Sequence, residues 1–274
     1  MHAQLTDADF FKFQQFIYSS AGIHLHNGKK SLVSGRLGGR VQDLGLSGFA
    51  DYWALLQSSQ GRAEVQTCID LLTTNETYFF REPKHFEWLT QHLQSSAPAD
   101  PGGWRVWSAA CSTGEEAYSL AMVLADVCGQ DVPWRILATD ISSRVLGKAR
   151  NGHYRMERAQ SITQPYLKRY CLKGIGSQQG TLLVRRELRE RVECLHLNLN
   201  ERLPQLGKFD VIFLRNVMIY FDLPTKRAVV DRLIDCLRPG GYLCIGHAES
   251  LNDVTTRVRH ISTAIYRKEE GMAR

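Results

Sequence analysis

The sequence lacks the features that mark exported and membrane-spanning proteins. None of its apolar runs approaches the roughly 20 residues that a transmembrane helix needs. Its first residues, MHAQLTDADFF, do not place a positively charged segment before an apolar one, as a signal peptide does. We therefore expect a cytoplasmic protein that does not insert into a membrane.

Patterns that hold metals or form disulfides are also missing. The seven cysteines are scattered along the chain, and no two of them form a CxxC pair. An odd, scattered set of this kind predicts neither a zinc site nor a disulfide framework. Most of these cysteines lie in apolar runs and are expected to be small buried residues. We therefore expect no metal.

The remaining composition is that of an ordinary globular protein. The 274 residues are 43% hydrophobic and 23% charged, which is enough for one larger domain and a small partner domain. The net charge of +6 favours an acidic partner. Charge alone does not distinguish nucleic acid, an anionic membrane and an acidic protein surface. The expected oligomeric state is a monomer.

The N-terminal part has the apolar spacing of helices and no strand pattern. Thr6 and Asp9 resemble a capping box, and apolar residues then recur every three or four positions. A second helix is expected over about 29–44, and Ser47 is expected to cap a third. Residues 1–72 are therefore predicted to form a small all-helical domain.

Beyond a linker at 73–95, the pattern changes to strands that alternate with helices. Helices are expected at 115–128 and 223–237. The expected strands are short apolar runs at 105–108, 135–139, 192–197, 209–214 and 242–246. Such alternation predicts an α/β domain over 96–274, with a doubly wound, Rossmann-like parallel sheet. Ligands bind such sheets beyond the carboxyl ends of the strands.

One stretch interrupts this alternation. Residues at about 165–190 resemble short antiparallel strands joined by a turn rich in glycine, with Gly174, Gly176 and Gly180. We interpret this stretch as an antiparallel β-subdomain inserted into the α/β domain.

A loop of small residues follows the first expected strand, and a helix begins directly after it. The segment is Ala109-Ala110-Cys111-Ser112-Thr113-Gly114-Glu115-Glu116. It is not the GxGxxG of dinucleotide-binding folds, and no lysine follows Gly114 as in a P-loop. Two carboxylates favour a cationic ligand over a phosphate, and S-adenosylmethionine carries an amino group and a sulfonium. The alternative is a pair of acidic residues stabilised by the dipole of the helix.

Later strand ends carry polar residues suited to a nucleoside. Asp140 ends the second strand, roughly 25 residues after the loop, where a carboxylate can accept both ribose hydroxyls. Asn198 follows a later strand, and its amide can bond the adenine edge. Arg215 and Asn216 end the next strand and are expected at the mouth of the site. The alternatives are a helix cap at Asp140 and an Asn turn at Asn198.

Together these segments closely resemble one family, the CheR-type chemotaxis receptor methyltransferases. The resemblance covers nearly the whole chain and rests on TNETYFFRE at 74–82, the loop at 109–116, RNVMIYF at 215–221, LRPGG at 237–241 and GHAES at 246–250. It implies a helical N-terminal domain, a Rossmann-like methyltransferase domain and an inserted β-subdomain. The implied reaction moves a methyl group from S-adenosylmethionine to glutamate side chains in the cytoplasmic domain of methyl-accepting chemoreceptors. S-adenosylhomocysteine and glutamate methyl esters are its products.

The resemblance also implies roles for individual residues. From the linker side, Asn75, Thr77 and Arg81 would line the cofactor pocket. The contacts from the sheet side would be Glu115, Asp140, Asn198, Leu199, Asn216 and Val217. Arg81 and Tyr220 would lie nearest the transferred methyl group and are the expected catalytic residues. The alternative for Tyr220 is an aromatic residue of the core. The partner of Arg81 can be the carboxylate of the substrate or that of the cofactor, and the sequence does not decide between them.

Methyl transfer to a carboxylate needs no general base. A glutamate with a pKa of about 4.3 is already ionised at neutral pH, and the sequence shows no obvious His–Asp or Ser–His arrangement. Alignment of the carboxylate with the methyl group can supply several kcal/mol of the barrier, up to about 7–11 in ideal cases.

Basic residues in the second helix suggest where an acidic receptor docks. Lys29, Arg36 and Arg40 are spaced by seven and four residues, which places them near one helix face, with Lys30 beside them. The alternative is a solvated face without a partner.

Two other functions remain open at the sequence level. The basic charge suggests an RNA methyltransferase, but the chain has no Asn-Pro-Pro-Tyr loop and no stripe of interleaved arginine and aromatic residues. We therefore expect no nucleic-acid partner. A non-catalytic signalling module that senses S-adenosylmethionine would bind the cofactor without turnover.

Overall fold

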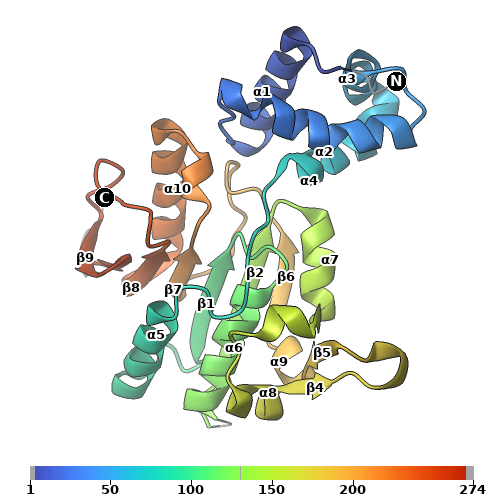
Figure 1. Ribbon diagram of the computed structural model, residues 1–274. Helices are drawn as coiled ribbons and strands as arrows, with labels where there is room; N and C mark the ends of the chain where they lie inside the picture. The colour runs from blue at the N-terminus through green and yellow to red at the C-terminus, as the bar shows by residue number, and fades with distance from the viewer. Residues whose placement is uncertain (1–3, 130, 270–274) are drawn as a thin grey trace.

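The computed structural model describes residues 4–129 and 131–269 and shows a helical domain beside an α/β domain (Figure 1). The helices of the first domain pack around their own core, which includes the fully buried Phe13, Leu37 and Tyr52. Its elements are α1 (Asp7–Ala21), η1 (Asn27–Lys29), α2 (Lys30–Asp43), α3 (Phe49–Gln57), η2 (Ser59–Gly61) and α4 (Arg62–Leu72). The predicted helical domain is confirmed. Within the two described ranges, no helix combines the length and apolar character that a membrane span requires.

A side-chain cap explains where α1 begins but not where α3 begins. The Thr6 hydroxyl oxygen accepts from the Asp9 amide at 3.1 Å and starts α1 as predicted. The prediction that Ser47 caps α3 is wrong. The N-cap position is occupied by Gly48, so Ser47 lies outside the helix start, and its hydroxyl donates to the Asp51 carboxylate instead.

The central sheet consists of parallel strands with two antiparallel strands added at one edge. Its order is β6 (Val192–His196), β2 (Trp134–Asp140), β1 (Trp104–Ala109), β7 (Phe209–Leu214), β8 (Leu237–Ile245), β10 (Ile265–Lys268) and β9 (Val258–Ser262). Apolar side chains of α5 (Lys84–Ser95), α6 (Glu115–Cys128) and α7 (Ser143–Asn151) cover one face, and α10 (Leu223–Cys236) covers the other (Figure 1). The doubly wound α/β class is therefore confirmed.

Several elements lie where the sequence analysis expected none. Strand β9 is mostly exposed, so no apolar run marks it, and it pairs with β10. Helix α5 lies inside the stretch 73–95 that we expected to be a linker, and it packs against α6. Its buried residues Phe86, Leu89 and Leu93 have helical spacing, so the sequence did contain a signal for it.

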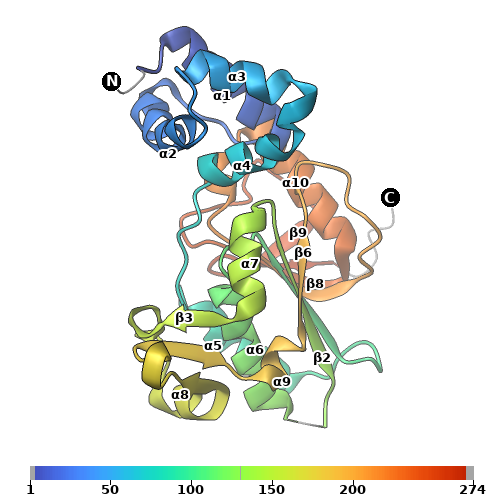
Figure 2. The same cartoon turned by 90° about the vertical axis from the view of Figure 1, so that its right-hand side faces the viewer.

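The insertion is a small antiparallel sheet at the end of the molecule away from the helical domain (Figure 2). Its order is β3 (His153–Arg155), β5 (Thr181–Val184) and β4 (Cys171–Lys173), and the predicted glycine-rich turn joins β4 to β5. The expected bounds of 165–190 are wrong in part. Pro165 lies in the first turn of a helix, a position that proline favours, so residues 164–170 are helical, and the sheet begins earlier. The helical elements here are η3 (Met156–Ala159), α8 (Gln164–Tyr170), η4 (Gly176–Gln178) and α9 (Arg186–Arg189).

Several contacts hold the helical domain against the α/β domain, and two of them fix elements near the strand ends. Ile23, just after α1, forms an antiparallel bridge with Phe221. Asp70 in the last turn of α4 accepts from the amide and the hydroxyl of Ser143, at 3.0 and 2.8 Å. A carboxylate of one domain thus caps helix α7 of the other.

Candidate active site

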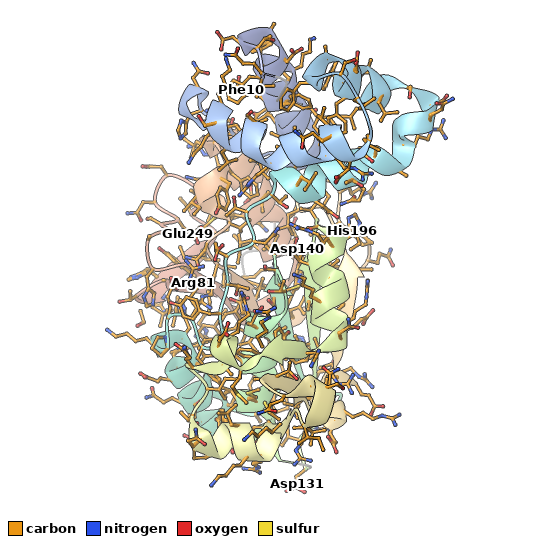
Figure 3. The ribbon with its side chains drawn as sticks, turned by 45° about the vertical axis from the view of Figure 1, so that its right-hand side comes forward. Phe10, Arg81, Asp131, Asp140, His196 and Glu249 are labelled. Atoms are coloured by element: carbon orange, nitrogen blue, oxygen red, sulfur yellow. The ribbon has the colours of Figure 1, made fainter. Side chains whose placement is uncertain are left out.

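A cavity lies where the carboxyl ends of β1, β2, β6 and β7 meet the helical domain. Its empty space is about 930 Å³, open solvent included. The linker segment 73–77 covers one side, and Ala21 and Ile23 close another. Figure 3 shows Asp140 and Arg81 in this region between the helices and the sheet. A cavity at this edge is what a doubly wound sheet predicts.

The structure brings together all but one of the residues expected to contact the cofactor. The cavity is lined by Asn75, Thr77, Arg81, Asp140, Asn198, Leu199, Asn216 and Val217, and also by Tyr220. They come from the linker and from three separate strand ends. The exception is Glu115.

Glu115 points away from the cavity. It is fully buried, and its carboxylate accepts from Arg158 Nε at 2.6 Å and from the Thr113 hydroxyl at 2.5 Å. Its neighbour Glu116 lines the cavity instead, because one step along a helix turns the side chain by about 100°. The sequence identified the acidic helix start but not which of its two carboxylates faces the cavity.

Asp140 is held at the end of β2 by two backbone amides. Its oxygens accept from Ser112 and Ser142, each at 2.9 Å, and the residue is 6% exposed. Burial raises the pKa of Asp140, although these two amides oppose the shift. A carboxylate offers about four acceptor positions, so capacity remains for hydroxyl donors in the cavity. Helix α7 begins at Ser143 with Ser142 as its N-cap, so Asp140 is not the helix cap.

Strained backbone gathers around this cavity. Ala110, Ser112 and Asn216 have φ angles of 71°, 51° and 57°, a conformation that costs on the order of 1–3 kcal/mol for a residue with a side chain. Gly114 closes the loop at 94°, and a Cβ there would lie 2.9 Å from the Tyr154 hydroxyl oxygen. Only glycine fits this position, because both the angle and the space exclude a side chain.

The side chain of Asn198 is already engaged. Its Nδ2 donates to the Ser20 carbonyl at 2.6 Å and to Glu201 at 2.8 Å, while its Oδ1 accepts from the Asn200 amide at 3.0 Å. The Asn turn that the sequence left open as an alternative is therefore formed. Asn198 links the helical domain to the cavity wall, and its contact with an adenine edge stays a prediction.

The two expected catalytic residues come from different segments. Arg81 belongs to the linker, and Tyr220 ends a short 3-10 turn, η5 (Met218–Tyr220). Arg81 Nη1 donates to the Glu76 carbonyl at 3.1 Å, and its guanidinium carbon lies 5.8 Å from the ring centroid of Tyr78. Both Arg81 and Tyr220 are partly exposed, so a substrate can reach them from solvent.

A buried arginine ties the linker to the sheet. Arg215, whose side chain is 2% exposed, donates to Glu82 at 2.9 Å, to Glu116 at 2.8 Å and to the Arg81 carbonyl. Burial alone would lower the pKa of Arg215, but the two carboxylates raise it. The roles of Glu82 and Glu116 were not predicted from the sequence, although both residues lie within the family segments. No pattern pointed to Ala21 in the cavity wall.

The three expected docking cations do not form one free stripe. Arg40 donates to Glu64 twice, at 2.8 and 2.6 Å. Arg36 donates to the Leu72 carbonyl at 2.6 Å. Lys29 is exposed, and it lines with Arg36 a second hollow that also includes Tyr220. Arg40 is therefore better placed to stabilise the helical domain than to bind a partner.

One group of possible metal ligands occurs in the described parts of the chain. Ligand atoms of Glu82, His85 and His247 lie within 4.8 Å of one another. Burial lowers the pKa of His85 to about 3, so its ring is neutral. Glu82 is already paired with Arg215, and a metal ion would have to compete with that guanidinium. The expectation that the protein holds no metal remains a prediction.

Comparison with known proteins decides the family. Residues 8–73 match the model described as CheR methyltransferase, all-alpha domain, and residues 75–267 match CheR methyltransferase, SAM binding domain. This chain belongs to the CheR methyltransferase family. The resemblance stated from the sequence segments is confirmed.

Relatives in this family align over nearly the whole chain. The chemotaxis protein methyltransferase of Escherichia coli (strain K12) is 43% identical, over 96% of this chain and 91% of its own length. The Klebsiella aerogenes protein of the same name is 45% identical, over 92% and 86%. Among solved structures, N-methyltransferase NodS from Bradyrhizobium japonicum WM9, in complex with S-adenosyl-l-homocysteine, is 16% identical with a TM-score of 0.42, over 73% of this chain and 95% of NodS.

The family is that of an S-adenosylmethionine-dependent methyltransferase, and the cavity residues fit this cofactor. Asp140 has acceptor capacity left for the ribose hydroxyls, and Glu76 provides a carboxylate at the cavity that suits an amino group. When bound, the cofactor supplies a methyl group on a positively charged sulfur. The residues that line the cavity would bind it, orient it and exclude water.

Proposed function

We propose that this protein transfers the methyl group of S-adenosylmethionine to glutamate side chains in the cytoplasmic domain of bacterial chemoreceptors. Its relatives carry the name chemotaxis protein methyltransferase. The observation that carries the proposal is the lining of the cavity, which contains no histidine or lysine among the described residues. An acceptor that must lose a proton would find neither of these bases there, and the Asp140 and Glu116 carboxylates already accept hydrogen bonds from Ser112, Ser142 and Arg215. A glutamate, with a pKa of about 4.3, has already lost its proton.

The lining residues then act by positioning. Tyr220 and Thr74 line both the cofactor cavity and the second hollow, which holds Lys29 and Arg36. A substrate that enters from that basic hollow would therefore meet the cofactor beside Tyr220. Arg81 can hold a carboxylate through two parallel hydrogen bonds. Alignment of this kind contributes at most about 7–11 kcal/mol to lowering the barrier.

The same proposal divides the chain by task. Residues 1–72 would bind and orient the receptor. The linker at 73–95 would place Asn75, Thr77 and Arg81 in the cavity wall. Residues 96–274 would bind the cofactor, and the inserted sheet of β3, β4 and β5 has no assigned task.

Transfer of labelled methyl groups to a purified receptor fragment tests the proposal. We expect label that mild base releases, because carboxyl esters hydrolyse readily and methylated amides do not. A matched fragment whose acceptor glutamates are changed to alanine should take up none. Base-stable label, or label on RNA and not on the receptor, would overturn the proposal. Cofactor binding without any transfer would point to a sensing module instead.

A further inference from the structure

We infer that Glu249 is a positioning residue whose carboxylate fixes the turn that carries Asn216, Val217 and Tyr220. Glu249 follows β8 and lies 33 residues beyond Asn216 in the chain. It is not one of the residues that line the cofactor cavity. Figure 3 shows it beside this region, at the level of Asp140. The inference rests on the methyltransferase activity of the family and not on the identity of the methyl acceptor.

The carboxylate of Glu249 bridges three backbone amides. Oε2 accepts from Asn216 at 2.9 Å and from Gly246 at 2.7 Å, and Oε1 accepts from Ile219 at 3.3 Å. Each oxygen has two lone pairs, so neither is overloaded. Hydrogen bonds from amides to an ionised carboxylate are shorter and stronger than those between neutral groups.

The turn depends on these bonds because its own backbone cannot supply them. Asn216 holds a φ of 57°, and the 3-10 turn η5 follows at Met218. The first amides of such a turn have no partner within it. Glu249 accepts from the Ile219 amide, directly before Tyr220, and from the Asn216 amide at the strained position. Both ends of the segment that faces the cofactor are thus held by one side chain.

Gly246 makes room for this arrangement. A Cβ on Gly246 would lie 2.6 Å from Asn216 Nδ2 and 2.9 Å from Glu249 Oε2. The glycine therefore allows the side chains of Asn216 and Glu249 to lie close to its backbone. The segment GHAES at 246–250 carried the family resemblance, and its first and fourth residues now have a physical reason.

Glu249→Gln tests the inference. The substitution keeps the size of the side chain but removes its charge, and its NH₂ group must face at least one backbone amide. We expect weaker cofactor binding, measured as a larger Kd. We also expect kcat at saturating cofactor to fall by about 10–100-fold, since a displacement of about 1 Å near a reacting group lowers the rate by up to about 100-fold. Asp253→Asn is the matched control, because it removes the charge of an exposed carboxylate four residues further on. The control should behave as the wild type.

A double-mutant cycle with Tyr220→Ala separates positioning from general stability. If Glu249 acts through the turn, Glu249→Gln should cost much less kcat when Tyr220 is already absent. Equal losses in both backgrounds would overturn the inference, as would a normal Kd and kcat in folded Glu249→Gln protein. Calorimetric measurement of the cofactor Kd needs no methyl acceptor. This measurement therefore tests the inference even if the receptor is not the substrate. Should Glu249→Gln fail to fold, Glu249→Asp keeps the charge on a shorter arm and should give an intermediate loss in the same measurements.

Discussion

At the scale of single residues, the site depends on carboxylates that backbone amides hold in place. Asp140 accepts from two amides and Glu249 from three. Burial raises the pKa of both carboxyls, and the amide hydrogen bonds oppose that rise. The amides fix each carboxylate in one orientation. Asp140 can then bind a ligand directly, whereas Glu249 orders the backbone that does so.

Asp140→Asn should weaken the binding of S-adenosylmethionine. The substitution keeps the shape of the side chain but removes the charge and part of the acceptor capacity that the ribose hydroxyls would use. Loss of charged hydrogen bonds of this kind costs about 1.5–3 kcal/mol. Calorimetry with the cofactor measures the effect, and Asp43→Asn, an exposed site in the helical domain, is the control. Unchanged affinity in a folded Asp140→Asn protein would remove Asp140 from the binding site.

Arg40→Ala should destabilise the helical domain rather than abolish receptor docking. The change leaves Glu64, whose side chain is 11% exposed, without its guanidinium partner, at an expected cost of about 1–3 kcal/mol in the free energy of unfolding. The hydrogen bond from Arg40 lowers the pKa of Glu64, and burial opposes it. A lowered carboxyl pKa adds stability above the unfolded value of about 4.5, and that stability is lost as the pH falls through the folded pKa.

Urea unfolding at neutral pH and at acid pH checks both parts of this prediction. The difference between wild type and Arg40→Ala should be largest at neutral pH and should shrink in acid. Equal stability at neutral pH, together with lost receptor methylation, would return Arg40 to the docking surface.

At the scale of elements, helix α7 begins at Ser143, just after Asp140 ends β2, and depends on the other domain for its cap. Its N-cap residue, Ser142, makes no side-chain capping bond, and its hydroxyl is buried without a hydrogen-bond partner among the described residues. Asp70 of α4 caps the helix instead, through the amides of Ser143 and Arg144. The fold of the cofactor site is thereby coupled to the helical domain.

Asp70→Ala should therefore lower the stability of the whole chain. Removal of an N-cap carboxylate costs about 0.5–2 kcal/mol, and Asp70 is only 6% exposed. We also expect a modest loss of cofactor affinity, because the start of α7 adjoins Asp140. Urea unfolding and calorimetry measure the two effects. If the denaturation midpoint matches that of Asp43→Ala, the cap contributes nothing and the coupling is absent.

The elements also show how far the sequence can be interpreted. The buried parallel strands and α6 were predicted because short apolar runs mark the strands and a clear start marks the helix. Strand β9 was missed since it is mostly exposed at the sheet edge, and 165–170 was taken for strand although Pro165 favours a helix start. At the site, strand-end positions such as Asp140 were predictable. The choice between Glu115 and Glu116 and the partner of Arg40 depend on tertiary packing, which spacing along the chain does not contain.

At the scale of the whole molecule, the positive net charge and the second hollow favour an acidic partner beside the cofactor cavity. The chain carries a net charge of +6. The second hollow, with Lys29, Arg36 and Tyr220, opens between the helical domain and the α/β domain. The positive electrostatic field of the protein raises the rate at which it associates with an acidic helical bundle. Salt screens this field over about 8–10 Å at ordinary ionic strength.

Receptor methylation should therefore fall with rising salt, while cofactor affinity should change little. Lys29→Glu should lower kcat/KM for the receptor and flatten its salt dependence, because charges at the rim of an interface act mainly on association. Arg135→Glu is the matched control. It makes the same change in net charge on an exposed residue near the start of β2, at the opposite end of that strand from Asp140. If both variants shift the salt dependence equally, only the net charge matters, and the hollow beside Tyr220 is not the docking surface. A larger effect of Lys29→Glu places the receptor there.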